Sequence, residues 1–331
     1  MTRSLVPPFG MFVGCGRSGT TMVRAIFDSH SQLAVTHHAQ FLVSMGGHRS
    51  RYESRAGLDR ARFRTDLVAS HRFAHLQLTP GDIEAVLADP VPDLASGLRR
   101  VLALYAERQG KLRYADKTPG HVTRIKLLAD LFDETRFVHI IRDGRNSWVG
   151  YRDRGFGPKR VADAAFNWKN RVERGRRAGA ALGPQRYLEV RYEDVVEDPA
   201  ASLAPVCRFL DLDFEPAMLE FHSRAETVLA GLEVADRKDF ENLYRPLTKG
   251  MRNWSTEMAP NELAAFESIA GDLLADLGYE LGSAAASHRG LQAEVERARR
   301  WAEWQGRRGA FQATLVRRRL TGSKNEMTAQ T

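Results

Sequence analysis

The chain has 331 residues, of which 43% are hydrophobic and 27% are charged, and its formal net charge at pH 7 is +8. This is the composition of a globular protein with one large domain or two ordinary ones. Its apolar runs stay far short of the length that crosses a bilayer, and two cysteines are too few for a disulfide framework. The positive charge favours anionic partners, such as nucleotides, nucleic acid or an anionic membrane surface.

The amino-terminal residues and the cysteines predict the compartment. The start, MTRSLVPPFG, has a single basic residue and no apolar stretch before the first expected strand, so we expect no secretory signal. The cysteines are Cys15, inside a glycine-rich loop, and Cys207. Because free thiols are the rule in a reducing compartment, we expect a cytoplasmic protein.

The first third of the chain predicts a strand, a glycine loop and a helix in succession. Residues 11–16 (MFVGCG) form a short apolar run that is typical of a buried strand. From residue 18 to about residue 29, the apolar positions fall on one helical face. Further along, we expect a strand at 33–36, a loop at 44–57 and mostly helical periodicity over 59–110.

The rest of the chain continues to alternate strands and helices. Residues 136–143 (RFVHIIRD) are nearly all apolar until they end in charge, which suits a strand covered on both faces of a parallel sheet. We also expect a brief strand at 112–119, a helix at 121–132, a strand at 186–194 and a helix that starts at Pro199 with Asp198 as its cap. The alternation predicts an α/β fold, with a doubly wound, mainly parallel central sheet and helices on both faces.

The residues from 283 to 331 differ from the rest of the chain. Arginine is frequent there and is interleaved with leucine, valine and tryptophan. Such a basic amphipathic helix lies on an anionic membrane surface or packs against a second copy of the chain, and a solvated helix that caps the domain is the alternative. We expect a single domain at 1–282, followed by a basic helical tail that is partly disordered at its end.

The stretch GCGRSGTT, residues 14–21, has the form of a phosphate-binding loop with one part changed. Gly14 and Gly19 keep the spacing of the triphosphate pattern G-x-x-x-x-G-K-[ST], but Thr20 takes the place of the lysine. A strand followed by a glycine loop and a helix aims backbone N–H groups and the positive helix end at an anion. Because triphosphate chemistry relies on that lysine and on Mg²⁺, the loop disfavours an NTPase.

Five segments together resemble the sulfotransferases that use 3′-phosphoadenosine 5′-phosphosulfate (PAPS). The loop GCGRSGTT resembles the 5′-phosphosulfate loop of that family, and ADKTPGH at 115–121 resembles its Lys-Thr-Pro segment. FVHIIRDGRNSWVGY at 137–151 is similar to its 3′-phosphate segment. VRYED at 190–194 and LTKGMRNW at 247–254 complete the set. The segments follow the family's order over roughly residues 10–280.

The resemblance implies PAPS as co-substrate, without a metal ion. A phosphosulfate carries less charge than the end of a triphosphate, so one arginine, hydroxyl groups and backbone amides balance it. Carried over position by position, the residues that would hold the 5′-phosphosulfate are Gly16, Arg17, Ser18, Gly19, Thr20 and Thr21.

The resemblance also assigns residues to the 3′-phosphate and the nucleotide. Arg142 matches the family's arginine on the 3′-phosphate. Eight positions later the family usually has a serine, where this chain has Gly150, and Ser147 is the candidate replacement. Further nucleotide contacts are assigned to Tyr192, Lys249 and Gly250.

An acceptor hydroxyl needs a base, and relatives of this loop type often place a glutamate about twenty residues past the loop. His38 falls at that position, with His37 beside it as the reserve candidate. Histidine suits the task because its unperturbed pKa of roughly 6.5 lies close to operating pH. Lys117 would stabilise charge as the sulfuryl bond breaks, and Asp116 would orient Lys117. The expected catalytic residues are therefore His38, Lys117 and Arg17.

The predicted function is transfer of a sulfuryl group from PAPS to a hydroxyl or amine of a carbohydrate, lipid or other small acceptor. A P-loop kinase, with Asp143 as its Mg²⁺ carboxylate, is the alternative that the absent lysine disfavours. A non-catalytic nucleic-acid binder is the remote alternative, because no nucleic-acid-binding motif accompanies the charge. Carbohydrate, glycolipid, small natural product and peptide tyrosine all stay open as acceptors.

Overall fold

The computed structural model describes residues 6–70, 72–152, 154–228, 242–250, 253–282, 298–299, 301–306 and 309. Within this part of the chain, two compact units are distinguished by their internal contacts. The first unit comprises Met1–Ile141 and Arg174–Lys249, and the second comprises Arg142–Glu173 and Gly250–Thr331. Most of the expected tail at 283–331 lies outside the described residues, so the domain boundary at 282 stays a prediction.

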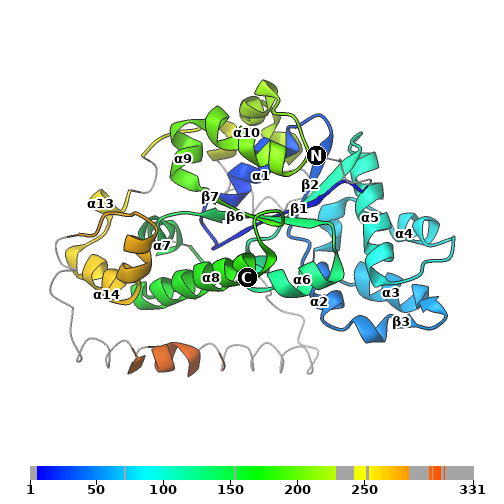
Figure 1. The fold of residues 1–331 in the computed structure, drawn as a ribbon, viewed down its shortest axis with the longest axis horizontal. Helices are drawn as coiled ribbons and strands as arrows, with labels where there is room; N and C mark the ends of the chain where they lie inside the picture. Colours follow the sequence, from blue (N-terminus) through cyan, green and yellow to red (C-terminus); the bar gives the residue numbers. More distant parts are fainter. Residues whose placement is uncertain are drawn as a thin grey trace. The chain divides into compact units, whose positions relative to one another are not determined.

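A five-stranded parallel sheet forms the centre of the first unit, as far as its residues are described (Figure 1). The order of the strands is β2-β5-β1-β6-β7, and every neighbouring pair runs parallel. Their bounds are β1 Phe9–Gly14, β2 Leu33–His37, β5 Arg113–Lys117, β6 Thr135–Ile141 and β7 Tyr187–Arg191. Because the strands are parallel, their carboxyl ends share one edge, which is where ligands bind in open α/β sheets.

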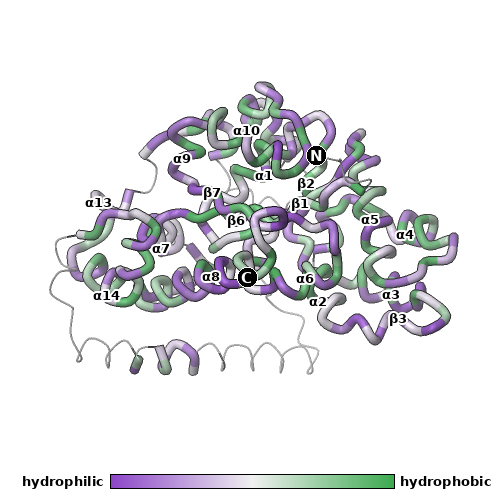
Figure 2. Tube along the Cα trace, in the orientation of Figure 1, coloured by the Kyte–Doolittle hydropathy of each residue, from purple (hydrophilic) through white to green (hydrophobic). Residues whose placement is uncertain are grey.

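Two hydrophobic clusters cover the two faces of this sheet. Side chains alternate along a strand, so Met11 and Val13 belong to one cluster while Phe12 belongs to the other. In Figure 2 the helices alternate between hydrophobic and hydrophilic positions, as expected of elements that bury one side. The structure confirms the predicted doubly wound fold with helices on both faces (Figure 1).

Each helix packs against the face of the sheet whose hydrophobic cluster contains its buried residues. One face is covered by α1 (Thr20–Asp28), α10 (Pro199–Phe209), η4 (Pro216–Arg224) and the short α9 (Tyr192–Glu197). The other is covered by α2 (Phe41–Gly46), α3 (Arg60–Val68), η2 (Phe73–Leu76), α4 (Pro80–Val86), α5 (Leu94–Arg108) and α6 (Ile125–Leu131). Asp198 caps α10 by accepting a hydrogen bond from the Ala201 N–H at 3.1 Å, as predicted.

Several expected bounds were shifted, such as those of the strands at 11–16 and 136–143, and three expectations were also wrong in the kind of structure. The helix expected at 121–132 is a 3₁₀ turn, η3 (Pro119–Thr123), followed by α6, because Arg124 has a non-helical φ of −127° between them. The strand expected at 186–194 ends at Arg191, and Tyr192 begins a helix. The loop expected at 44–57 contains the end of α2, a 3₁₀ turn and the ribbon of β3 (Glu53–Ser54) and β4 (Gly57–Leu58), which are too short to give a periodic pattern.

The described part of the second unit is helical. It contains α7 (Gly144–Arg152), the first half of α8 (Val161–Leu182), α13 (Trp254–Glu257) and α14 (Pro260–Asp276). A Cβ atom on Gly144 would lie 2.4 Å from the Trp168 ring and 2.7 Å from Phe266, so glycine lets α7 start against these rings. None of the described helices is long and apolar enough to cross a membrane.

Candidate functional site

The loop after β1 is built from unusual backbone conformations. Arg17 and Gly19 have left-handed φ values of 66° and 84°, and the Ser18 N–H donates to the Cys15 carbonyl at 3.3 Å. A left-handed conformation is uncommon for arginine and is found most often where function requires it. Ser18 is fully buried, and its hydroxyl has no hydrogen-bond partner among the described residues. A buried hydroxyl of this kind is ready to donate to a ligand.

Gly19 lies directly beneath the ring of Tyr192, the first residue of α9. A Cβ atom at position 19 would come within 2.2 Å of two ring carbons of Tyr192. Glycine is therefore required twice, by the positive φ and by the ring. The sequence resemblance assigned Tyr192 to the nucleotide. In the structure, Tyr192 packs against the loop at Gly19.

Lys117 reaches the loop from the end of the neighbouring strand β5. It is fully buried, and its Nζ donates to the Thr21 hydroxyl at 3.3 Å. Thr21 stands in the first turn of α1, beside the buried Thr20. Thr20 occupies the position of the missing lysine, and the Lys117 amino group reaches the start of α1 from β5.

The two candidate bases, His37 and His38, form a corner at the end of β2. We call residues 36–39 the histidine corner. His38 has a left-handed φ of 60°, and its N–H donates to the Lys117 carbonyl at 3.0 Å. The rings of His37 and His38 have centroids 4.4 Å apart, and His75 Nδ1 lies 3.1 Å from the His37 carbonyl. His37 is buried, whereas His38 is partly exposed.

Burial and nearby cations lower the pKa of the groups around this corner. Desolvation is the main cause for both histidines, and Lys117 is the next, so the pKa of each lies well below 6.5. Burial, followed by the positive charge of Arg24, also brings the pKa of Lys117 well below its usual range. Both imidazoles are therefore neutral at pH 7, as a proton acceptor must be.

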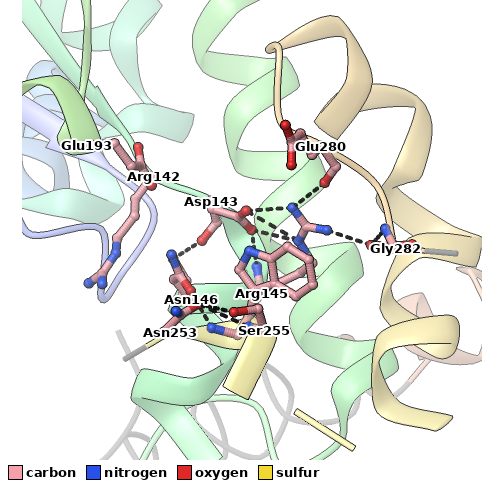
Figure 3. A network of polar contacts seen from close by, with 12 residues as sticks. Arg142, Asp143, Arg145, Asn146, Glu193, Asn253, Ser255, Glu280 and Gly282 are labelled. Carbon is pink, nitrogen blue, oxygen red and sulfur yellow. Dashed lines mark hydrogen bonds and ion pairs between the residues drawn. The ribbon is translucent and has the colours of Figure 1, made fainter. Parts of the chain in front are cut away.

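In the second unit, Arg142 and Asp143 directly follow β6. Asp143 forms an ion pair with Arg145 (Figure 3), and both belong to an ionic cluster with Trp254 and Glu267. We call it the Arg145 cluster. The Arg145 guanidinium binds Asp143 Oδ2 at 2.7 Å and Glu267 Oε1 at 2.5 Å, and it stacks 3.7 Å from the centre of the Trp254 ring. Asn146 Oδ1 accepts a hydrogen bond from the Trp254 N–H at 2.8 Å. Two segments recognised separately in the sequence, RDGRN and NW, are thus joined.

The Arg142 side chain points away from Arg145 in Figure 3. It is 4% exposed, and its carbonyl accepts a hydrogen bond from Trp168 Nε1 at 2.9 Å. Ser147 is buried in α7, and its hydroxyl lies 3.4 Å from the Asp143 carbonyl one turn earlier. Gly150 is also buried in α7.

Lys249 and Gly250 lie in an exposed segment. Lys249 Nζ donates to Glu197 Oε1 at 2.7 Å, and Gly250 has a left-handed φ of 76°. The first unit thus brings together the loop from Gly16 to Thr21 with Lys117, the histidine corner and Tyr192. The second unit holds Arg142, Ser147 and Gly150.

Some residues of the site were not found from the sequence. Arg24 is buried on α1, with its Nε donating to the Val35 carbonyl at 3.0 Å, and it adds positive charge beside Lys117. His75 of η2 contacts the His37 carbonyl, and Arg72, directly before η2, contacts His75. Both lie 33 or more residues beyond the corner in the sequence, and no local pattern marks them. In the described ranges, no group of three or more His, Cys, Asp or Glu side chains is arranged to hold a metal ion.

Comparisons with known proteins agree with this loop-and-helix arrangement. The model of the sulfotransferase family matches residues 11–216, which is more than half of the chain. The chain belongs to the sulfotransferase family. It is 24% identical over 275 residues to protein-tyrosine sulfotransferase 2 of Gallus gallus, covering 81% of this chain and 68% of that protein.

Two further similarities extend the comparison. Over 115 residues, the sulfotransferase is 30% identical to the omega-hydroxy-beta-dihydromenaquinone-9 sulfotransferase Stf3 of Mycobacterium bovis, covering 30% of this chain and 29% of that protein. Its fold is similar to the sulfotransferase domain of the Synechococcus PCC 7002 olefin synthase, with a TM-score of 0.57 and 22% identity. That alignment covers 85% of this chain and 98% of the domain.

Proposed function

We propose that this sulfotransferase moves a sulfuryl group from PAPS to a hydroxyl group of its acceptor, with His38 as the base. The observation that carries the proposal is the buried Ser18 hydroxyl, unpartnered among the described residues, in a loop with left-handed Arg17 and Gly19. A loop that exposes donors to a ligand and pairs with a separate ammonium group, Lys117, suits a phosphosulfate.

The residues present fit the donor. The amides from Gly16 to Thr21, the Ser18 hydroxyl and the Arg17 guanidinium would hold the 5′-phosphosulfate. Tyr192 covers Gly19 and would border the nucleotide. We assign the 3′-phosphate to Arg142, with Ser147 and Gly150 on the helix that follows, and we assign further nucleotide contacts to Lys249 and Gly250.

When bound, PAPS supplies a sulfuryl group whose S–O bond to the phosphate breaks as an S–O bond to the acceptor oxygen forms. The neutral His38 imidazole takes the proton of the acceptor hydroxyl. Lys117 and Arg17 stabilise the negative charge that develops on the leaving phosphate. The left-handed backbone of His38 and its hydrogen bond to the Lys117 carbonyl fix the position of the base relative to the Lys117 backbone.

The acceptor class is narrowed by what the relatives are named for. One is named for protein tyrosine and another for an omega-hydroxylated menaquinone, and both names specify a hydroxyl acceptor. We therefore place phenols and primary alcohols, including lipid-linked ones, ahead of amines. The tail at 283–331 lies mostly outside the described residues, so its membrane contact or dimer contact stays a prediction.

Calorimetry with 3′-phosphoadenosine 5′-phosphate (PAP), the spent donor, tests the proposal without any knowledge of the acceptor. We expect binding in the presence of a chelator, because the loop uses amides, hydroxyls and a guanidinium. Tight binding of magnesium-ATP combined with no response to PAP or PAPS would overturn the proposal and favour a kinase.

A transfer experiment then identifies the acceptor. The protein is incubated with ³⁵S-labelled PAPS and a panel of a tyrosine peptide, a simple phenol, a long-chain primary alcohol and an amino sugar. We expect label on a phenol or an alcohol. Transfer to the amino group alone would contradict the hydroxyl assignment while leaving the donor assignment intact.

A further inference from the structure

Asp116 is a buried carboxylate in the middle of the sheet, next to Lys117. It is 1% exposed, and on β5 it is in register with Thr36 of β2 and Met11 of β1. Burying a carboxylate is costly unless hydrogen bonds and opposite charge compensate it. The partners that compensate Asp116 therefore show what this residue holds in place.

One carboxylate oxygen of Asp116 fastens both ends of the histidine corner. Oδ1 accepts hydrogen bonds from the Thr36 hydroxyl at 2.8 Å and from the Ala39 N–H at 3.1 Å. These two groups flank His37 and His38, whose backbone has to turn through the left-handed φ of 60° at His38. The same oxygen accepts a hydrogen bond from the Thr118 hydroxyl at 3.1 Å, so the Lys-Thr-Pro segment is fastened too.

The second carboxylate oxygen faces an imidazole. Oδ2 lies 3.1 Å from His121 Nδ1, and both side chains are almost completely buried. Burial raises the pKa of Asp116, but the neighbouring His121, the Thr36 hydroxyl and the Ala39 N–H together bring it below its usual value. The carboxylate is therefore charged, and its charge raises the pKa of Lys117 against the effects of burial and Arg24.

We propose that Asp116 is a positioning residue of this site, which fixes the turned backbone of His38 and the Lys-Thr-Pro segment that carries Lys117. This inference rests on the proposed function. It assigns one carboxylate to two tasks, because the base and the cation come from adjacent strands and Asp116 contacts the segments that carry both. Asp116 itself does not reach the reacting atoms in this assignment.

The first test compares Asp116→Asn with Asp28→Asn. Asp28 is the matched control, because it is also a buried carboxylate beside β2, with Oδ1 accepting the N–H of Val35, a residue outside the histidine corner, at 2.8 Å. We expect Asp116→Asn to lower kcat by about 10²-fold, since small displacements of catalytic groups cost that much. Calorimetric affinity for PAP should change less than about threefold, because the loop residues stay in place.

The split between turnover and donor binding separates positioning from a merely structural role. Asp116→Asn should lose kcat while its affinity for PAP stays within about threefold of the wild type, because the displaced groups are the base and the segment that carries Lys117. Asp28→Asn should keep kcat within about threefold. Equal kcat losses in the two variants, or a loss of PAP affinity in Asp116→Asn as large as its loss of kcat, would overturn the proposal.

A second measurement does not depend on sulfuryl transfer. In NMR spectra of ¹⁵N-histidine-labelled protein, we expect the ring signals of His38 to shift in Asp116→Asn. They should shift by less in Thr36→Val, which removes one hydrogen bond to Asp116 but keeps the charge of its carboxylate. Both variants keep the other charged and titratable groups that face His38, so these groups do not cause a difference between the variants. They are Lys117 of β5, Arg72 directly before η2, His75 of η2, His121 of η3 and the adjacent His37. Unchanged His38 signals in Asp116→Asn would contradict the inference even if the wild type failed to use PAPS.

Discussion

The phosphosulfate loop with its histidine corner and the Arg145 cluster are both rich in charge, but they treat their polar groups in opposite ways. In the loop and the corner, the Ser18 hydroxyl and His38 Nδ1 are buried without a hydrogen-bond partner among the described residues, and Arg17 and His38 have left-handed backbones. In the cluster, the Arg145 guanidinium is saturated by Asp143, Glu267 and the Glu280 carbonyl.

This difference in hydrogen bonding distinguishes residues proposed to bind a ligand from residues that stabilise the fold. A charged motif such as RDGR looks uniformly functional as a sequence. In the structure Arg145 is consumed by internal partners, whereas the Arg142 side chain points away from them (Figure 3). The left-handed backbones of the loop and the histidine corner, together with the unpartnered Ser18 hydroxyl, point to a ligand, whereas the ion pairs of Arg145 stabilise the second unit.

The largest expected effect is a loss of turnover when the proposed base in the histidine corner is replaced. Replacing the proposed base, His38→Asn, should lower kcat by about 10² to 10⁴-fold, because general-base catalysis contributes that much. The measurement is turnover of PAPS with the acceptor that the label screen identifies. His48→Asn, an exposed histidine ten residues later, should keep wild-type turnover. Near-normal turnover of His38→Asn would transfer the base role to His37.

The next effect concerns architecture. Arg145→Met should lower the free energy of unfolding by about 3–5 kcal/mol, because it leaves Asp143 and Glu267 buried without their counter-charge. Arg142→Met should weaken PAP binding, because the proposed 3′-phosphate site loses its guanidinium. Chemical denaturation of Arg145→Met and calorimetry of Arg142→Met with PAP check the two expectations. Unchanged PAP affinity in Arg142→Met would remove Arg142 from the proposed 3′-phosphate site.

Two glycines sharpen the account of the loop. Gly19→Ala should weaken PAP binding at least about tenfold, because its Cβ atom collides with Tyr192 as well as straining a left-handed φ. Gly110→Ala carries the same kind of strain at φ 68°, with nothing within 4 Å of the new Cβ atom. It should cost about 1 kcal/mol of stability and leave PAP binding intact. Similar binding by the two variants would remove Tyr192 from the site.

The smallest effect is a pH dependence that belongs to the first unit. The pKa of His37 lies well below 6.5, and burial lowers that of His139 to about 3. Below pH 6.5 the unfolded chain binds these protons and the folded chain does not, so stability falls as pH drops, by up to about 1.4 kcal/mol per pH unit for each group. Hydrogen exchange at pH 7 and pH 5, corrected for intrinsic rates, should show greater loosening of residues 6–141 than of residues 142–173. An equal loss of protection from exchange in the two ranges would contradict the assignment of the pH dependence to the first unit.

Local patterns were sufficient for the elements whose residues lie close together in the chain. The apolar run before GCGRSGTT predicted β1, the glycines predicted the loop, and Asp198 with Pro199 predicted the start of α10. The helix expected at 121–132 was wrong, because Pro119 and Gly120 favour a 3₁₀ turn that periodicity does not reveal. The roles of Lys117 and His38 came from resemblance and position, and they stay predictions.

By itself, the sequence determined the alternation of strands and helices, the lysine-free loop and the family to which the chain belongs, because periodicity and short motifs are local properties. The tertiary structure alone decided which charged residues are already satisfied. Asp116 meets Thr36 and Ala39 from another strand, and Arg145 meets Glu267 from a helix more than a hundred residues away. Whether a buried charge is paired depends on neighbours that the fold, not the local sequence, supplies.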